Sequence, residues 1–199
     1  MPAADLILAS GSAVRARLLT NAGVRFRIET SGVDEDAVKA AAGDGVPAAE
    51  IALRLAAAKA RAVSENHGGA LVVGADQMLE CEGKLFDKPA DMAAAAANLR
   101  RFSGRTHRLI TACCLMRDGG IVWESVETAR LTMRDLSDGE IDAYLSAAGE
   151  DVLGSVGCYR LEELGVQLFT EIDGDFFVIL GLPLLGLLAR LREQGVLGS

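Results

Sequence analysis

The stretch "LILASGSAVRARLL", residues 6–19, is unusual because an apolar run leads directly into two serines, a glycine and a basic helix start. The apolar residues predict a buried strand, and Ser12 is a suitable N-cap for a helix that runs to Asn21. A helix start carries unpaired N–H groups and the positive end of the helix dipole, which favour an anion. We therefore expect Ser10, Ser12 and Arg15 to hold one; an ordinary capped turn with a surface arginine is the alternative.

The patterns that follow alternate between strand and helix. A helix is predicted from Pro47 to about Asn66, and a strand is predicted at residues 25–30. The apolar run at 70–76 predicts a second buried strand that ends in Asp76, and a hairpin is expected after it.

Further hairpins and helices complete the chain, among them a hairpin that turns at Asp118-Gly119 and a helix that begins with the capping box of Ser137 and Glu140. The order of these elements predicts an α/β fold with a mixed β-sheet flanked by helices. We expect one domain over residues 1–199, with two lobes around a central groove.

The composition of the chain narrows the classes of partner and the location that we expect. The 199 residues carry a formal charge of −8, which argues against a nucleic acid polymer or an anionic membrane as partner. No signal-peptide pattern is visible, and Gly181 and Pro183 interrupt the most apolar stretch. The four cysteines form no C-x-x-C pair, so we expect reduced thiols and a cytoplasmic location.

Two acidic segments could form a metal site. Asp76 follows the last apolar residue of its strand, where α/β proteins often place a base or a metal ligand, and "VDE" at 33–35 adds a second acidic loop. Carboxylates that converge would hold Mg²⁺ or Mn²⁺. An aspartate that merely starts a turn is the alternative.

Three cations stand at unusual places. Lys59 lies near the apolar stripe of an alanine-rich helix, Lys88 precedes a proline, and Arg105 lies between a helix and a strand. Each residue type is more often solvated at its tip. His67 and His107 are both expected on the surface or in loops.

Together these residues resemble the Maf family of nucleoside triphosphate pyrophosphatases. Residues 6–19 are similar to its Ala-Ser-x-Ser-Pro-Arg-Arg signature, and further similar motifs follow in the family's order: "VDE", "LAAAKA", "VGADQ", "DKP", "SGRTH" and "LGLPL". The resemblance implies hydrolysis between the α and β phosphates, a divalent metal, a dimer and a fold like that of the inosine triphosphatases. By position it implies that Asp76 is the general base, that Glu35 and Asp76 hold the metal, and that Ser10, Ser12, Arg15, Lys59 and Lys88 bind the triphosphate.

Two features bear on activity and specificity. Val14 stands where the family has an arginine, so either Arg17 replaces that contact or turnover is weaker. Gln77 and Glu162 resemble the branch that acts on 7-methyl-GTP, since a carboxylate can accept hydrogen bonds from a guanine edge. Three alternatives stay open: a dTTP/UTP-type enzyme, a solvated loop acid at Glu162, and a nucleotide-binding regulator of cell division with weak activity.

Overall fold

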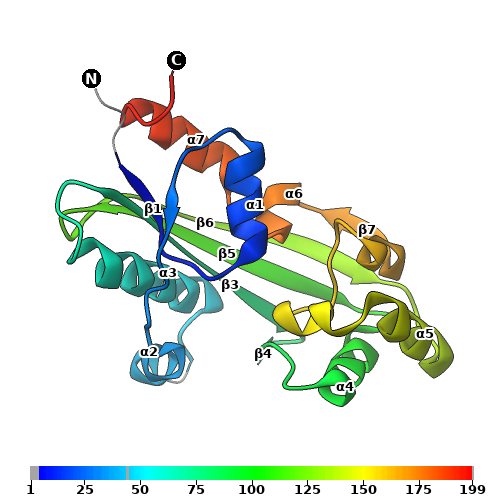
Figure 1. Ribbon diagram of the computed structural model, residues 1–199. Helices are drawn as coiled ribbons and strands as arrows, with labels where there is room; N and C mark the ends of the chain where they lie inside the picture. Colours follow the sequence, from blue (N-terminus) through cyan, green and yellow to red (C-terminus); the bar gives the residue numbers. More distant parts are fainter. Residues whose placement is uncertain (1–4, 44, 199) are drawn as a thin grey trace. The chain divides into compact units, whose positions relative to one another are not determined.

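In the computed structural model, which describes residues 5–43 and 45–198, the first apolar run forms strand β1 (Leu6–Leu8) (Figure 1). β1 pairs in parallel with β2 (Arg27–Ile28) on one side and with β3 (Leu71–Cys81) on the other. All three side chains of β1 are buried, which is typical of a parallel strand covered on both faces.

The described chain divides into two compact units, each assembled from separate segments. Unit 1 contains the described residues up to 77 together with 111–127 and 181–198, and unit 2 contains 78–110 and 128–180. Three strands contribute residues to both units: β3, β5 (Thr106–Arg117) and β6 (Gly120–Met133). Whether the units act as one domain with a groove stays a prediction.

Unit 1 contains the strand order β2-β1-β3-β5-β6, and helices flank these strands (Figure 1). The helices are α1 (Ala13–Asn21), α2 (Glu35–Ala42), α3 (Ala48–Ser64) and α7 (Leu184–Glu193). The predicted N-cap of α1 is confirmed, because the Ser12 side chain accepts a hydrogen bond from the Arg15 backbone N–H. The predicted helix from Pro47 is confirmed as α3.

Gly74 of β3 lets α3 approach the sheet closely. A Cβ at position 74 would lie 2.1 Å from the carbonyl oxygen of Ala56 and 2.8 Å from the backbone nitrogen of Ala60. Both alanines are fully buried, so the helix backbone packs directly on the strand. This contact fixes which residues of α3 face β3.

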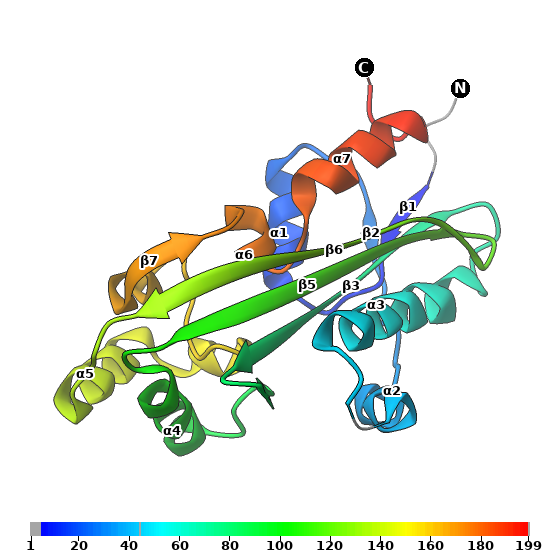
Figure 2. The ribbon, with the colours of Figure 1, turned by 180° about the vertical axis from the view of Figure 1, so that it is seen from behind.

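Unit 2 contains the far ends of the long strands with β4 (Lys84–Phe86) and β7 (Phe169–Asp173), both of which pair antiparallel with their neighbours. Helices α4 (Met92–Phe102) and α5 (Asp138–Ala148) pack against each other there, as the view from behind also shows (Figure 2). Short helical segments η1 (Glu150–Gly154), η2 (Leu164–Leu168) and α6 (Phe176–Ile179) complete the unit.

The core of unit 2 corrects the prediction for His107. The sequence predicts a surface or loop residue, but His107 is fully buried in β5. Its Nε2 lies 2.7 Å from the Tyr159 hydroxyl, and Phe102 and Phe169 pack around its ring. The aromatic neighbours come from segments distant in sequence, so local polarity gave no sign of them.

The predicted fold class is confirmed, because parallel and antiparallel pairs occur among strands that helices flank. Two strand predictions were wrong in extent. The strand expected at 25–30 is reduced to two exposed residues of β2, and β3 runs without a break through Asp76 to Cys81. Within residues 5–43 and 45–198, no helix is long and apolar enough to cross a membrane.

Candidate active site

The candidate site lies where β1 ends beside the longer β3. The hydrogen bond from the backbone N–H of Ala9 to the carbonyl of Val73, at 2.8 Å, follows the last paired residues of the two strands. β3 continues while the β1 chain turns away at Ser10 into α1. Asp76 is therefore not at the end of its own strand, as the sequence predicts, but three residues beyond the end of the pairing with β1.

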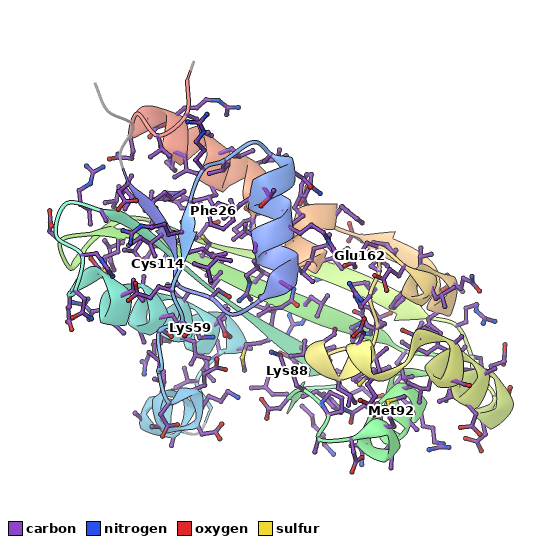
Figure 3. The ribbon with its side chains drawn as sticks, viewed as in Figure 1. Phe26, Lys59, Lys88, Met92, Cys114 and Glu162 are labelled. Carbon is purple, nitrogen blue, oxygen red and sulfur yellow. The ribbon has the colours of Figure 1, made fainter. Side chains whose placement is uncertain are left out.

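Alternation along β3 places Asp76 on the face that α3 covers. Side chains two residues apart share a face of a strand, and Gly74 packs on α3. Lys59 follows Ala56 by one helical turn, so the same contact brings its side chain to Asp76. Figure 3 shows Lys59 on α3.

Lys59 bridges the two carboxylates that the resemblance assigns to a metal. Its Nζ lies 2.7 Å from Oδ1 of Asp76 and 2.7 Å from Oε1 of Glu35, the first residue of α2. Lys59 is 8% exposed and Asp76 is 6% exposed, whereas the Glu35 side chain is 47% exposed. The solvated-tip alternative is therefore wrong for Lys59, and a buried charged pair stands at this position.

Arg15 joins three segments of unit 1. Its Nε donates to the carbonyl of Gly181 at 2.7 Å, and its Nη1 donates to the carbonyl of Ala75 at 2.9 Å and to Oγ of Ser10 at 3.2 Å. Burial lowers the pKa of the Arg15 guanidinium from its ordinary value, while the nearby carboxylate of Asp76 raises it. The guanidinium and the Lys59–Asp76 pair thus belong to one electrostatic cluster.

The hydroxyl groups of Ser10 and Ser12 are available to donate hydrogen bonds. Oγ of Ser10 accepts the backbone N–H of Ser12 at 3.2 Å as well as Nη1–H of Arg15. A hydroxyl oxygen that accepts twice has used both lone pairs, so its hydrogen is directed toward a different acceptor. Oγ of Ser12 accepts the Arg15 backbone N–H, so each serine oxygen at the start of α1 accepts from the chain and keeps its own hydrogen for a further acceptor such as an anion.

Gln77 points to the opposite face of β3 from Asp76, since the two are adjacent in one strand. Its Nε2 donates to Oγ1 of Thr111 at 2.9 Å, and Thr111 is fully buried in β5. The side chain of Gln77 is therefore oriented by a partner that the sequence analysis did not identify.

Lys88 and Glu162, labelled in Figure 3, belong to unit 2. Lys88 is exposed after β4, and Glu162 lies between η1 and η2 with 17% of its side chain exposed. The Glu162 carboxylate is 3.9 Å from Nε of Arg160, so it is not a fully solvated loop acid. That these two residues reach the Asp76 cluster stays a prediction.

Arg105, the third cation at an unusual place, binds to other residues of unit 2. Its Nε pairs with Glu82 at 2.9 Å, and its Nη1 donates to the carbonyl of Arg101 in the last turn of α4. It also lines a cavity of about 300 Å³, which contains none of the predicted site residues. The residues that line it are Cys81, Glu82, Lys84, Phe86, Arg100, Arg101 and Arg105.

The donor set can hold a hard divalent cation together with a phosphorylated ligand. Within residues 5–43 and 45–198, no group of three or more His, Cys, Asp or Glu side chains is placed to hold a metal ion. Glu35 and Asp76 supply two carboxylates, and Mg²⁺ is commonly bound by one or two carboxylates plus substrate phosphates and water. The site therefore fits a metal that arrives with its substrate.

Sequence reasoning did not find Thr111, the Ala75 carbonyl or the Gly181 carbonyl. Backbone carbonyls carry no side-chain signal, and a threonine inside an apolar strand is an ordinary residue. The "LGLPL" motif at 180–184 contains Gly181, but its pattern alone does not indicate a contact with Arg15.

Comparisons with known proteins cover nearly the whole chain. A family model described as Maf-like protein matches residues 5–194. A nucleoside triphosphate pyrophosphatase of Nitrobacter hamburgensis is 54% identical, over 96% of this chain and 95% of its own length. A protein of the same name from Paramagnetospirillum magneticum is 52% identical, over 96% and 99%. A 7-methyl-GTP pyrophosphatase of Rhizobium meliloti is 47% identical, over 98% of each chain.

Proposed function

Because this chain belongs to the Maf family, we propose that it is a hydrolase that converts a nucleoside triphosphate to the monophosphate and pyrophosphate. One observation carries the proposal: Asp76, Lys59, Glu35 and Arg15 gather in one cluster next to the start of α1. Relatives at about half identity carry the name of that activity.

Asp76 acts as the general base in this proposal. The water oxygen bonds to the α-phosphorus, the bond from that phosphorus to the α–β bridging oxygen breaks, and pyrophosphate leaves. The water proton goes to Asp76. Oδ1 of Asp76 is held by Lys59, and among the described residues no hydrogen bond reaches Oδ2, so Oδ2 is the oxygen that accepts the proton.

The triphosphate is bound by the start of α1 and its neighbours. The backbone N–H groups of the first turn, the hydroxyls of Ser10 and Ser12, and the guanidinium of Arg15 are hydrogen-bond donors toward phosphate oxygens. Lys88 adds a further cation if unit 2 contributes to the site.

Glu35 and Asp76 would hold Mg²⁺ or Mn²⁺, which would neutralise charge on the triphosphate. The geometry supports this assignment, because Oδ1 of Asp76 and Oε1 of Glu35 each lie 2.7 Å from Nζ of Lys59, so the two carboxylates converge closely enough to share one cation.

The base that we propose is a modified guanine, as in 7-methyl-GTP, the substrate in the name of the Rhizobium meliloti relative. Gln77 and Glu162 are the residues proposed to select it. The restricted exposure of Glu162 supports this role, because a partly desolvated carboxylate discriminates more strongly between a donor and an acceptor on the base. A dTTP/UTP-type enzyme is the alternative.

The test is pyrophosphate release in Mg²⁺ or Mn²⁺ from a panel of 7-methyl-GTP, GTP, dTTP, UTP and CTP. We expect 7-methyl-GTP to react fastest, and Asp76→Asn to lower kcat about 10²- to 10⁴-fold. Asp142→Asn, the same change at an exposed position of α5, is the matched control. Binding without hydrolysis by the wild type would favour a regulatory protein, and faster turnover of dTTP and UTP would contradict the assigned base.

A further inference from the structure

Gly181 has a backbone conformation that few residues other than glycine adopt. Its φ is +95°, in the region where an L side chain is strained. The residue stands just before Leu182 and Pro183, which lead into α7. Leu182 and Leu187 are fully buried, so the segment is anchored in unit 1 at the point where the Gly181 carbonyl projects.

That carbonyl oxygen accepts the hydrogen bond from Nε of Arg15 at 2.7 Å, the shortest of the three that the guanidinium makes among the described residues. Together with its bonds to Ser10 and Ala75, the guanidinium thereby uses its Nε–H and both hydrogens of Nη1. Among the described residues, Nη2 makes no hydrogen bond, so three contacts fix the plane of the guanidinium and leave one nitrogen as a donor.

An added side chain at this position would touch the guanidinium of Arg15. A Cβ at position 181 would lie 3.4 Å from Nε and 3.5 Å from Nη2 of Arg15. Both distances are ordinary van der Waals contacts, so the cost of a side chain comes from the φ of +95°, and relief of that strain would rotate the carbonyl away from Nε.

We propose that Gly181 is a positioning residue: its carbonyl orients Arg15 so that Nη2 faces the bound phosphates. The C-terminal segment before α7 thereby takes part in phosphate binding without touching the ligand. This inference rests on the proposed function for its ligand, a phosphate chain, whereas the contact itself is a property of the folded protein.

The decisive variant is Gly181→Ala, studied with Gly195→Ala as matched control. Gly195 follows α7 and has a φ of +73°, and no atom of the described residues lies within 4 Å of an added Cβ, so alanine there imposes backbone strain without a contact with Arg15. We expect Gly181→Ala to weaken pyrophosphate binding in calorimetry about tenfold or more. The KM for the best substrate should rise by the same factor with kcat within about twofold, as expected when binding alone is lost. Gly195→Ala should change neither.

A double-mutant cycle separates positioning from general destabilisation. Arg15→Lys has no Nε–H to position, so adding Gly181→Ala to Arg15→Lys should not weaken pyrophosphate binding further. A purely structural role for Gly181 would weaken binding equally in both backgrounds, and that result would overturn the proposal.

A direct measurement covers the case in which Gly181→Ala does not fold. In wild-type protein with ¹⁵N-labelled arginine, the Nε–H of Arg15, assigned from its loss in Arg15→Lys, should exchange with water more slowly than that of the exposed Arg25. Equal exchange would refute the contact and with it the proposal. A protected Nε–H in a protein that hydrolyses no triphosphate would refute the proposed function instead, and pyrophosphate binding would still test Gly181.

Discussion

The ammonium of Lys59 lies 2.7 Å from Oδ1 of Asp76, and less than a tenth of either residue is exposed. The two residues stand on different elements, α3 and β3, and the close approach of these elements at Gly74 holds them together. Buried charges of this kind are stable only as a pair.

Lys59→Met should therefore lower the free energy of unfolding by about 3 kcal/mol, because it leaves the Asp76 carboxylate buried without its partner. Chemical denaturation measures this loss, and pyrophosphate release should fall with it. Arg54→Met is the control on the same helix: its exposed pair with Glu50 contributes only about 0.3–0.5 kcal/mol. Equal losses in both variants would contradict the burial of the Lys59–Asp76 pair.

Gly74→Ala should prevent the close contact of β3 with α3, since the added methyl would meet backbone atoms of Ala56 and Ala60. We expect a loss of more than about 3 kcal/mol or an unfolded product. Gly139→Ala is the same change in α5, where φ is ordinary and no atom of the described residues lies within 4 Å of the added Cβ, and it should stabilise the protein by about 0.5–1 kcal/mol. Calorimetric melting compares the two, and a tolerated Gly74→Ala would contradict the packing.

Acid should destabilise the protein through His107. Burial lowers the pKa of His107 to about 4, and its Nδ1 has no hydrogen-bond partner within residues 5–43 and 45–198. The unfolded chain, with a pKa near 6.5, binds the proton first, so the stability contributed by neutral His107 is complete above about pH 6.5. It is lost progressively as the pH falls toward 4, by an amount on the order of 3 kcal/mol.

His107→Gln should flatten that part of the pH–stability curve, because glutamine can still bond to Tyr159 but does not titrate. Urea unfolding at a series of pH values measures the slope. His67→Gln, a change of the chain's other histidine, leaves the His107–Tyr159 contact in place and should leave the His107 contribution intact. An unchanged slope in His107→Gln would show that other groups set the acid sensitivity.

Thr111→Val should reduce base discrimination if Gln77 reads the base. The isosteric change removes the acceptor that holds Nε2 of Gln77, at a stability cost of about 1 kcal/mol. We expect the kcat/KM ratio of 7-methyl-GTP to dTTP to fall several-fold. Thr106→Val, which removes the exposed contact with Thr132 in unit 2, is the control and should leave the ratio unchanged. An equal kcat/KM ratio in both variants would show that the orientation of Gln77 does not determine base specificity.

Local chemistry explains the elements that were predicted correctly. The capping box of Ser137 and Glu140 starts α5, and Asp118 and Gly119 both take positive φ in the turn between β5 and β6. The apolar run at 6–8 and the helix start at Ser12 were confirmed for the same reason. These signals act over a few residues, so they can be read from the sequence.

Contacts between distant segments explain the rest. Local polarity predicted His107 on the surface, whereas aromatic residues of other segments bury it. Asp76 was predicted to end a strand because its apolar run ends there, yet β3 continues with new partners in unit 2.

The sequence by itself identified the residues that we propose carry the chemistry: the serines and arginine at the start of α1, the lysine of α3 and the two acids. Only the tertiary structure decided how they are paired. Lys59 reaches Asp76 because Gly74 admits α3, and Arg15 is fixed by a carbonyl 166 residues away in the chain. Residue type sets what a group can do, but hydrogen-bond geometry depends on positions in space, which sequence neighbours do not specify.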